Sequence, residues 1–298
     1  MNVKKINFLN MDLFEIILKM TLFLLLFHGG ISWHVKIPIK FIVLLTFFIE
    51  DLWKKPIVWF SLFLFQISGI WFDYYIIDNH QYLLAYWSLA IFLSTVGPKE
   101  FHRLSIIKVN GNLLCSFSMI FAVVWKGFLS DDFLKGDFFL FTLFDDSRFH
   151  NFTHFLTGLS FEQLKENQWF FNTVLEGDYK NVPIKELLLN KNVKFTILAK
   201  TLTYWTLFVE GSIGLLFLIN HFWKKRALFI LKHIFLLVFI LSTYPVATVT
   251  GFGWLLAVFG LSDLEDEPLL KVSYFLIILI LQIFSIPMGD IFLSLKEF

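Results

Sequence analysis

The chain has 298 residues, of which 57% are hydrophobic and only 16% are charged, and its formal net charge is +1. A soluble domain carries about 25% charged residues, so this composition excludes an ordinary soluble protein, and the small net charge argues against a nucleic-acid partner. The single cysteine, Cys115, excludes an intramolecular disulfide and a cysteine-rich zinc cluster.

Apolar runs close to 20 residues long recur along the chain, and a helix of about that length crosses the roughly 30 Å of hydrocarbon in a bilayer. The first four runs predict spans at about 12–30, 37–50, 56–76 and 82–97. The first run carries Glu15 and Lys19 and is not followed by a small-residue cleavage site, so we interpret it as a retained helix rather than a signal peptide. Because the acid precedes the base by four residues, we expect the two side chains to neutralise each other.

The later spans are separated from the first group by a long polar segment. A fifth span at about 110–128 ends near Lys126, and the polar segment then covers about 130–198. Further runs are predicted at about 200–220, at 227–244, up to about 261, and at 271–293. Pro245 makes the number uncertain, because proline ends or kinks a helix. The predicted fold is therefore all-α: a polytopic transmembrane bundle of eight or nine spans in the lipid bilayer, forming one domain over residues 1–298.

Lysine and arginine in the short connections predict the orientation in a cell membrane, since cytoplasmic loops carry an excess of these residues. Four clusters fall on one side of the predicted bundle: Lys4 with Lys5, Lys54 with Lys55, Lys99 with Arg103 and Lys108, and Lys224 with Lys225 and Arg226. This pattern predicts a cytoplasmic N-terminus and places segment 130–198 on the outer face.

The outer segment is rich in phenylalanine. Phe-rich stretches occupy 133–144 and 149–161, and a stretch with helix-like spacing of apolar residues follows at 161–177. Aromatic-rich helices anchor at the headgroup level of a membrane. We expect short helices that lie on the bilayer surface; a lid over a cavity is the alternative.

Two further charged residues, Lys126 and Glu210, lie in or at the end of later apolar runs. Lys126 ends the fifth span, where it either faces a cavity as a base or reaches the membrane edge with its ammonium in water. Asp131 and Asp132 follow closely and are candidates to hold it charged. Glu210 lies near the middle of its run, where a carboxylate needs a partner or a cavity. A neutral Glu210 that hydrogen-bonds to a neighbouring helix is the alternative.

Two histidines lie beside the same runs. His80 follows Asp78 and Asn79 at the junction of two outer ends of spans, where this group can orient a polar ligand. A capped turn, with Asp78 or Asn79 as the helix N-cap, explains the same residues. His233 opens a later span and is typical of a packing residue. No metal-ligand spacing accompanies these histidines.

The order of these motifs resembles the HTTM superfamily, the membrane region shared with vitamin K-dependent gamma-carboxylase. The resemblance lies in an Asn-His opening of a helix, a helix that ends in a lysine, a glutamate-bearing helix and a histidine-bearing helix. These stretches are residues 78–92, 118–136, 202–218 and 231–259. Phe133 stands where tryptophan is usual in the family.

The resemblance implies a function for each of these motifs. It implies that Lys126 is a catalytic base that deprotonates a reduced quinone, a vitamin K-like cofactor, and that His80 is part of the quinone site. It further implies supporting roles in ligand binding for four residues, namely Asn79, Tyr82, Glu210 and His233. An enzyme of this kind would be a carboxylase-like lyase or an oxidoreductase.

Two function classes remain open. The first is a membrane enzyme that uses a quinone-like lipid. The second is a non-catalytic accessory protein for the maturation, export or immunity of a secreted peptide or protein, a role that bacterial members of the superfamily suggest. The abundance of Phe, Ile, Lys, Asn and Leu favours a bacterial source.

Overall fold

The computed structural model describes residues 12–30, 32–97, 100–175, 190–244 and 249–284. All regular secondary structure in these ranges is helical, as the sequence predicts. The chain divides into two compact units, residues 1–117 with 216–298 (unit 1) and residues 118–215 (unit 2).

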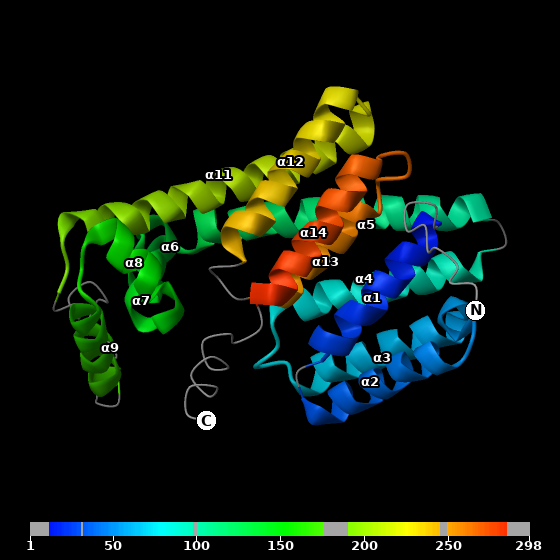
Figure 1. Ribbon diagram of the computed structural model, residues 1–298, viewed down its shortest axis with the longest axis horizontal. Helices are drawn as coiled ribbons and strands as arrows, with labels where there is room; N and C mark the ends of the chain where they lie inside the picture. Colours follow the sequence, from blue (N-terminus) through cyan, green and yellow to red (C-terminus); the bar gives the residue numbers. More distant parts are fainter. Residues whose placement is uncertain (1–11, 31, 98–99, 176–189, 245–248, 285–298) are drawn as a thin grey trace, which may run out of the picture. The chain divides into compact units, whose positions relative to one another are not determined.

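Unit 1 contains most of the apolar helices (Figure 1). In chain order they are α1 Leu13–His28, α2 Trp33–Phe48, the short η2 Leu52–Lys54, α3 Pro56–Phe72, α4 Asn79–Val96, the first part of α5 Glu100–Val124, the end of α11 Val193–Trp223, α12 Arg226–Thr243, α13 Thr250–Leu261 and α14 Pro268–Phe284. Pro56 begins α3 at a position where proline costs no hydrogen bond.

Helix α13 forms the core of unit 1. Every residue from Gly253 to Leu261 is buried, as expected for a helix that is apolar on all sides. It packs against α1, α4, α12 and α14, and Figure 1 shows α1 between α13 and the pair α2 and α3.

Buried polar groups join the helices of unit 1. The Trp87 indole of α4 donates to Thr21 Oγ1 of α1 at 2.9 Å. Gln66 Nε2 of α3 donates to Ser88 Oγ of α4 at 2.7 Å. Because an unpaired polar group costs free energy in an apolar interior, these bonds specify how α4 lies against α1 and α3.

Unit 2 is built from short helices between the two parts of α5 and α11 that belong to it. They are the π-helical turn η3 Trp125–Leu129, α6 Asp131–Lys135, α7 Asp137–Asp145, η4 Ser147–Phe149, α8 His150–Thr157 and α9 Phe161–Leu175. Gly136 and Gly158 have φ values of 87° and 76° and end α6 and α8 in the left-handed conformation. The rings of Phe141, Phe144 and Phe171 pack with centroids 4.7–5.6 Å apart. The Phe-rich segment therefore packs its own core, while its location at an outer membrane surface stays a prediction.

Within the described ranges, three helices are long and apolar enough to cross a membrane, judged by length and composition: Arg103–Leu129, Val193–Trp223 and Arg226–Thr243. Shorter apolar helices occupy Pro56–Phe72, Thr250–Leu261 and Pro268–Ile283. The total of eight or nine spans stays a prediction.

The boundaries of several predicted spans differ from the structure. Helix α2 begins at Trp33 rather than near 37, and α11 begins at Val193 rather than near 200, inside the predicted polar segment 130–198. Helix α5 begins at Glu100 rather than near 110, so Arg103 and Lys108 belong to the helix and not to a connecting loop. The predicted span at 271–293 begins earlier, at Pro268, and residues 285–293 lie outside the described part of the chain.

Candidate functional site

Lys126 lies in the π-helical turn Trp125–Leu129 that continues α5. Single π-helical turns occur mostly as bulges within α-helices and frequently at functional sites. The Lys126 side chain is 26% exposed, and its ammonium lies 5.3 Å from the centre of the Phe133 ring. The predicted lysine therefore occupies a distinctive backbone position and is partly accessible.

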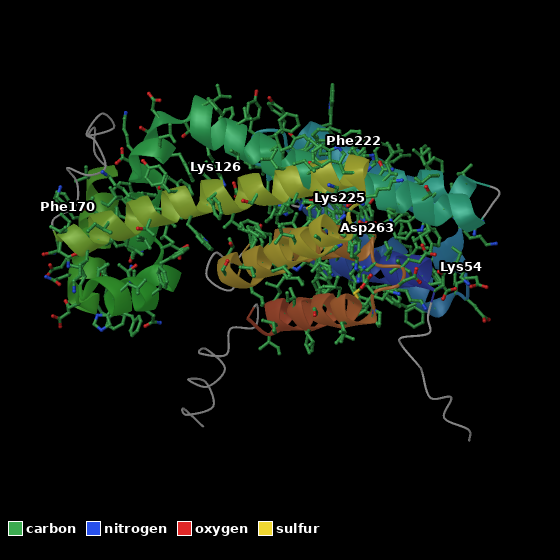
Figure 2. The ribbon with its side chains drawn as sticks, turned by 90° about the horizontal axis from the view of Figure 1, so that it is seen from above. Lys54, Lys126, Phe170, Phe222, Lys225 and Asp263 are labelled. Carbon is green, nitrogen blue, oxygen red and sulfur yellow. The ribbon has the colours of Figure 1, made fainter. Side chains whose placement is uncertain are left out.

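Glu210 of α11 is the partner of Lys126. Lys126 Nζ donates to Glu210 Oε1 at 2.6 Å and to Oε2 at 2.8 Å, and the Glu210 side chain is only 8% exposed. Figure 2 shows Lys126 close to α11. The expectation that Glu210 needs a partner is met within unit 2. Asp131 and Asp132, the other candidate partners, are exposed in the first turn of α6. A helix N-terminus favours acidic side chains at these positions. Lys126 pairs with Glu210 and not with these two aspartates.

The Lys126–Glu210 pair can hold one shared proton in two ways. An ammonium facing a carboxylate is favoured by their attraction, and a neutral amine facing a carboxylic acid avoids the desolvation of two charges. Contacts of 2.6–2.8 Å are short enough for the proton to pass between the two groups. The geometry is that of a proton-transfer pair, and equally that of a structural tie between α5 and α11.

His80, Asn79 and Tyr82 lie in the first turn of α4, in unit 1. Gln81 Nε2 donates to His80 Nε2 at 3.0 Å and to the backbone oxygen of His28 at 3.2 Å. Asn79 and Tyr82 are exposed. Asp78 is the N-cap residue of α4, but its side chain accepts no capping hydrogen bond. Because Lys126 belongs to unit 2, the predicted joint action of His80 and Lys126 stays a prediction.

His233 of α12 is fully buried. Its Nδ1 is hydrogen-bonded to the Tyr274 hydroxyl of α14 at 2.9 Å, and its ring packs against Phe217 and Phe229. These contacts are those of the packing residue that the sequence indicates, and they connect α12 with α14.

Sequence reasoning missed a second charged cluster, in unit 1. Lys232 of α12 is fully buried; it donates to Asn112 Oδ1 of α5 at 2.7 Å and to Asp263 Oδ2. Lys108 Nζ lies 2.7 Å from the other oxygen of Asp263. The sequence contains a signal for this cluster, because the charged residue Lys232 interrupts an apolar run. Only the neighbouring His233 was considered as a candidate in that run.

Asp263 follows α13 and forms ion pairs with both Lys108 and Lys232. Burial by itself would raise the pKa of the Asp263 carboxyl, but the charges of Lys232 and Lys108 outweigh burial, so its pKa lies below the ordinary value of 3.8. The carboxyl is therefore ionised at neutral pH and neutralises part of the charge of the two lysines.

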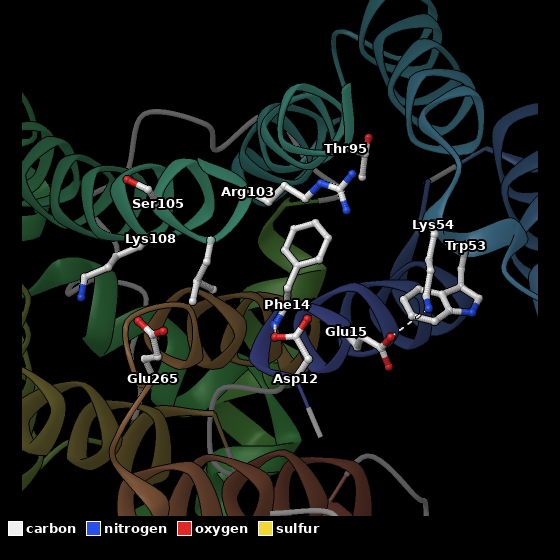
Figure 3. A pocket seen from close by; sticks show the side chains of 11 residues that line it. Asp12, Phe14, Glu15, Trp53, Lys54, Thr95, Arg103, Ser105, Lys108 and Glu265 are labelled. Carbon is white, nitrogen blue, oxygen red and sulfur yellow. Dashed lines mark hydrogen bonds and ion pairs between the residues drawn. The ribbon is translucent and has the colours of Figure 1, made fainter. Parts of the chain in front are cut away.

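Two pockets of unit 1 lie beside this cluster. One of about 690 Å³ is lined by acidic and basic side chains in equal number (Figure 3). In it Glu15 pairs with Lys54 at 2.9 Å, more closely than with Lys19 at 3.8 Å, so the predicted mutual pair is only part of a larger group. The other pocket, of about 440 Å³, is lined by Lys108, Lys232 and Asp263 among others. A third pocket, of about 360 Å³, belongs to unit 2 and contains Lys135 and Lys200. Lys126 does not line any of these three pockets.

Comparison with protein-family models, with curated proteins and with solved structures found no match to this chain.

Proposed function

We propose that this chain is a multi-pass membrane protein of eight or nine spans, and that its Lys126–Glu210 pair takes a proton from an acidic hydroxyl of a lipid-soluble substrate such as a reduced quinone. The contact of 2.6 Å between the Lys126 ammonium and the buried Glu210 carboxylate carries the proposal. The π-helical turn that holds Lys126 and the resemblance of the motifs to the HTTM superfamily support it.

Lys126 can be reached by a ligand that approaches from its exposed side, because its side chain is 26% exposed. The Phe133 ring beside the ammonium is buried and packs against it from within unit 2. A reduced quinone, when bound, would supply an acidic hydroxyl. Lys126 then accepts its proton at Nζ after passing its own proton to Glu210, so that the pair gains one proton and one positive charge, which balances the anion formed.

The test uses purified protein in phosphatidylcholine vesicles with a reduced naphthoquinone. Dissolved oxygen oxidises the quinol, and deprotonation accelerates this oxidation, which ultraviolet absorbance follows. We expect wild-type protein to raise the rate and Lys126→Arg to return it to background, because arginine does not lose its proton at working pH. Glu210→Gln should lower the rate, and Lys165→Arg, an exposed lysine of α9, serves as the matched control. A full rate in Lys126→Arg at normal protein abundance would contradict the proposal.

An accessory role in the maturation, export or immunity of a secreted peptide is the second candidate. It is favoured by the completeness of the ion pair, since both Glu210 oxygens accept from Lys126, as a structural tie requires. In that case arginine replaces Lys126 without loss of the cellular phenotype, because arginine pairs readily with a carboxylate.

A further inference from the structure

The pocket of about 440 Å³ in unit 1 has an excess of positive charge. Its lining includes four basic side chains and one acidic side chain: Lys108, Lys224, Arg226, Lys232 and Asp263. Arg226 pairs with Glu267, the residue before α14, at 3.0 Å, and Asp263 is shared by Lys108 and Lys232. These basic side chains thus contact two carboxylates, Glu267 and Asp263, among the described residues. Two of the four positive charges are therefore not neutralised by these pairs.

The backbone around the pocket adds to this preference for an anion. Helix α12 begins at Arg226, and the side chain of its N-cap residue, Lys225, makes no capping hydrogen bond. Arg226 and Phe229 of the first turn of α12 line the pocket. The N–H groups and the dipole at the start of a helix favour negative charge. Figure 2 labels Phe222 and Lys225 where α11 ends and α12 begins.

Lys224 occupies a backbone conformation that glycine would adopt with less strain. Its φ is +45°, in the left-handed region that is unfavourable for L-residues other than glycine. It lies directly after α11, where glycine is the usual residue, and its side chain lines the pocket. A residue in a strained conformation at a pocket is consistent with a functional side chain.

Cationic and hydrogen-bonding side chains converge at this pocket. Lys108 and Arg226 have side chains that are 48% and 64% exposed and are accessible to a ligand. Asn112, Asn220 and Ser105 add hydrogen-bonding groups to the lining, and Phe229 adds an apolar wall. Several cations with amide donors and a helix N-terminus match the oxygens of a phosphate group.

We propose that this pocket binds a phosphate group, carried either by a soluble phosphorylated compound or by the headgroup of an anionic lipid. The site lies in unit 1 and is independent of the proton-transfer function proposed for Lys126. The orientation predicted from Lys and Arg places it on the cytoplasmic side, where both sources of phosphate occur.

The test has one arm for each source. In the first, inorganic phosphate is titrated by calorimetry into the protein in a neutral detergent. In the second, the protein is placed in phosphatidylcholine nanodiscs with or without phosphatidylglycerol, and native mass spectrometry counts the lipids retained. Binding in the first arm alone identifies a soluble phosphate ligand, and retention of phosphatidylglycerol over phosphatidylcholine identifies a lipid headgroup.

Lys224→Gly and Lys224→Asn are the decisive variants, because glycine and asparagine both tolerate the left-handed conformation. Neither should lower the melting temperature, and each should weaken binding roughly tenfold, the loss of one charge-assisted contact. Asp51→Gly relieves the other positive φ outside glycine among the described residues; Asp51 does not line this pocket, so this variant should bind as wild type does. Absence of binding to wild type in both arms, or unchanged binding in both Lys224 variants, would overturn the proposal.

Discussion

Asp263 is the residue on which the charge balance of unit 1 depends most directly. It is buried after the end of α13 and contacts one lysine of α5 and one of α12. Lys232 is fully buried, and a buried ammonium without a counter-ion is costly. The Asp263 carboxylate therefore stabilises the buried ammonium of Lys232, and it also forms an ion pair with Lys108.

Asp263→Asn should lower the free energy of unfolding by about 3–5 kcal/mol, the usual effect of removing one partner of a buried ion pair. Unfolding in a fixed detergent, followed by circular dichroism, measures the change. Asp266→Asn, an exposed carboxylate in the same connection, is the control and should change little. An Asp263→Asn variant as stable as wild type would show that Lys232 is solvated or neutral in the folded protein.

The same carboxyl predicts a direction of pH dependence. Its pKa in the folded protein is below the ordinary value of 3.8, so the stabilisation that it provides is complete above that value and is lost as the pH falls through the lower, folded pKa. We expect wild-type stability to fall in acid below about pH 4 more steeply than that of Asp263→Asn. Parallel curves for the two proteins, from melting temperatures measured across this pH range, would count against the assigned shift.

Glycines determine how closely the central helix α13 approaches its neighbours. A Cβ at Gly260 would overlap the ring of Tyr274 on α14, and one at Gly253 would overlap the ring of Tyr244. Small residues allow helix backbones to pack closely in apolar surroundings. Tyr274 cannot easily move away, because it is fully buried and hydrogen-bonded to His233.

Gly260→Ala should therefore destabilise the protein by about 1–3 kcal/mol through overpacking. Gly97→Ala is the matched control: the nearest atom to its Cβ is a backbone oxygen of Ser94 at 3.8 Å, and its φ of −65° suits alanine. Thermal unfolding of both variants in one detergent gives the comparison. Equal stability of Gly260→Ala and wild type would mean that α14 shifts without cost.

For the whole molecule, the distribution of Lys and Arg predicts that segment 130–198 faces the outside. Lys165 of α9 and Lys55 after η2 are both exposed. With Cys115 replaced by alanine, Lys165→Cys should react with an impermeant maleimide in intact cells, and Lys55→Cys only after lysis. The reverse pattern would show that the orientation is wrong.

The sequence by itself determined the class of fold, since runs of apolar residues near membrane-spanning length dictate helices whatever their neighbours are. Most helix boundaries were predicted within a few residues, as for α1, α3 and α12. The start of α5 was not, because the charged residues Arg103 and Lys108 are typical of a connecting loop, whereas the structure places both inside the helix.

The sequence also singled out Lys126 and Glu210 one at a time, because the cost of a charge in an apolar run depends on local composition alone. Only the tertiary structure decided that the two form a pair, and that Lys232, Asn112 and Asp263 form another group. The physical reason is that such contacts join helices distant in the chain. Their distances depend on helix packing, which a local pattern of residues does not encode.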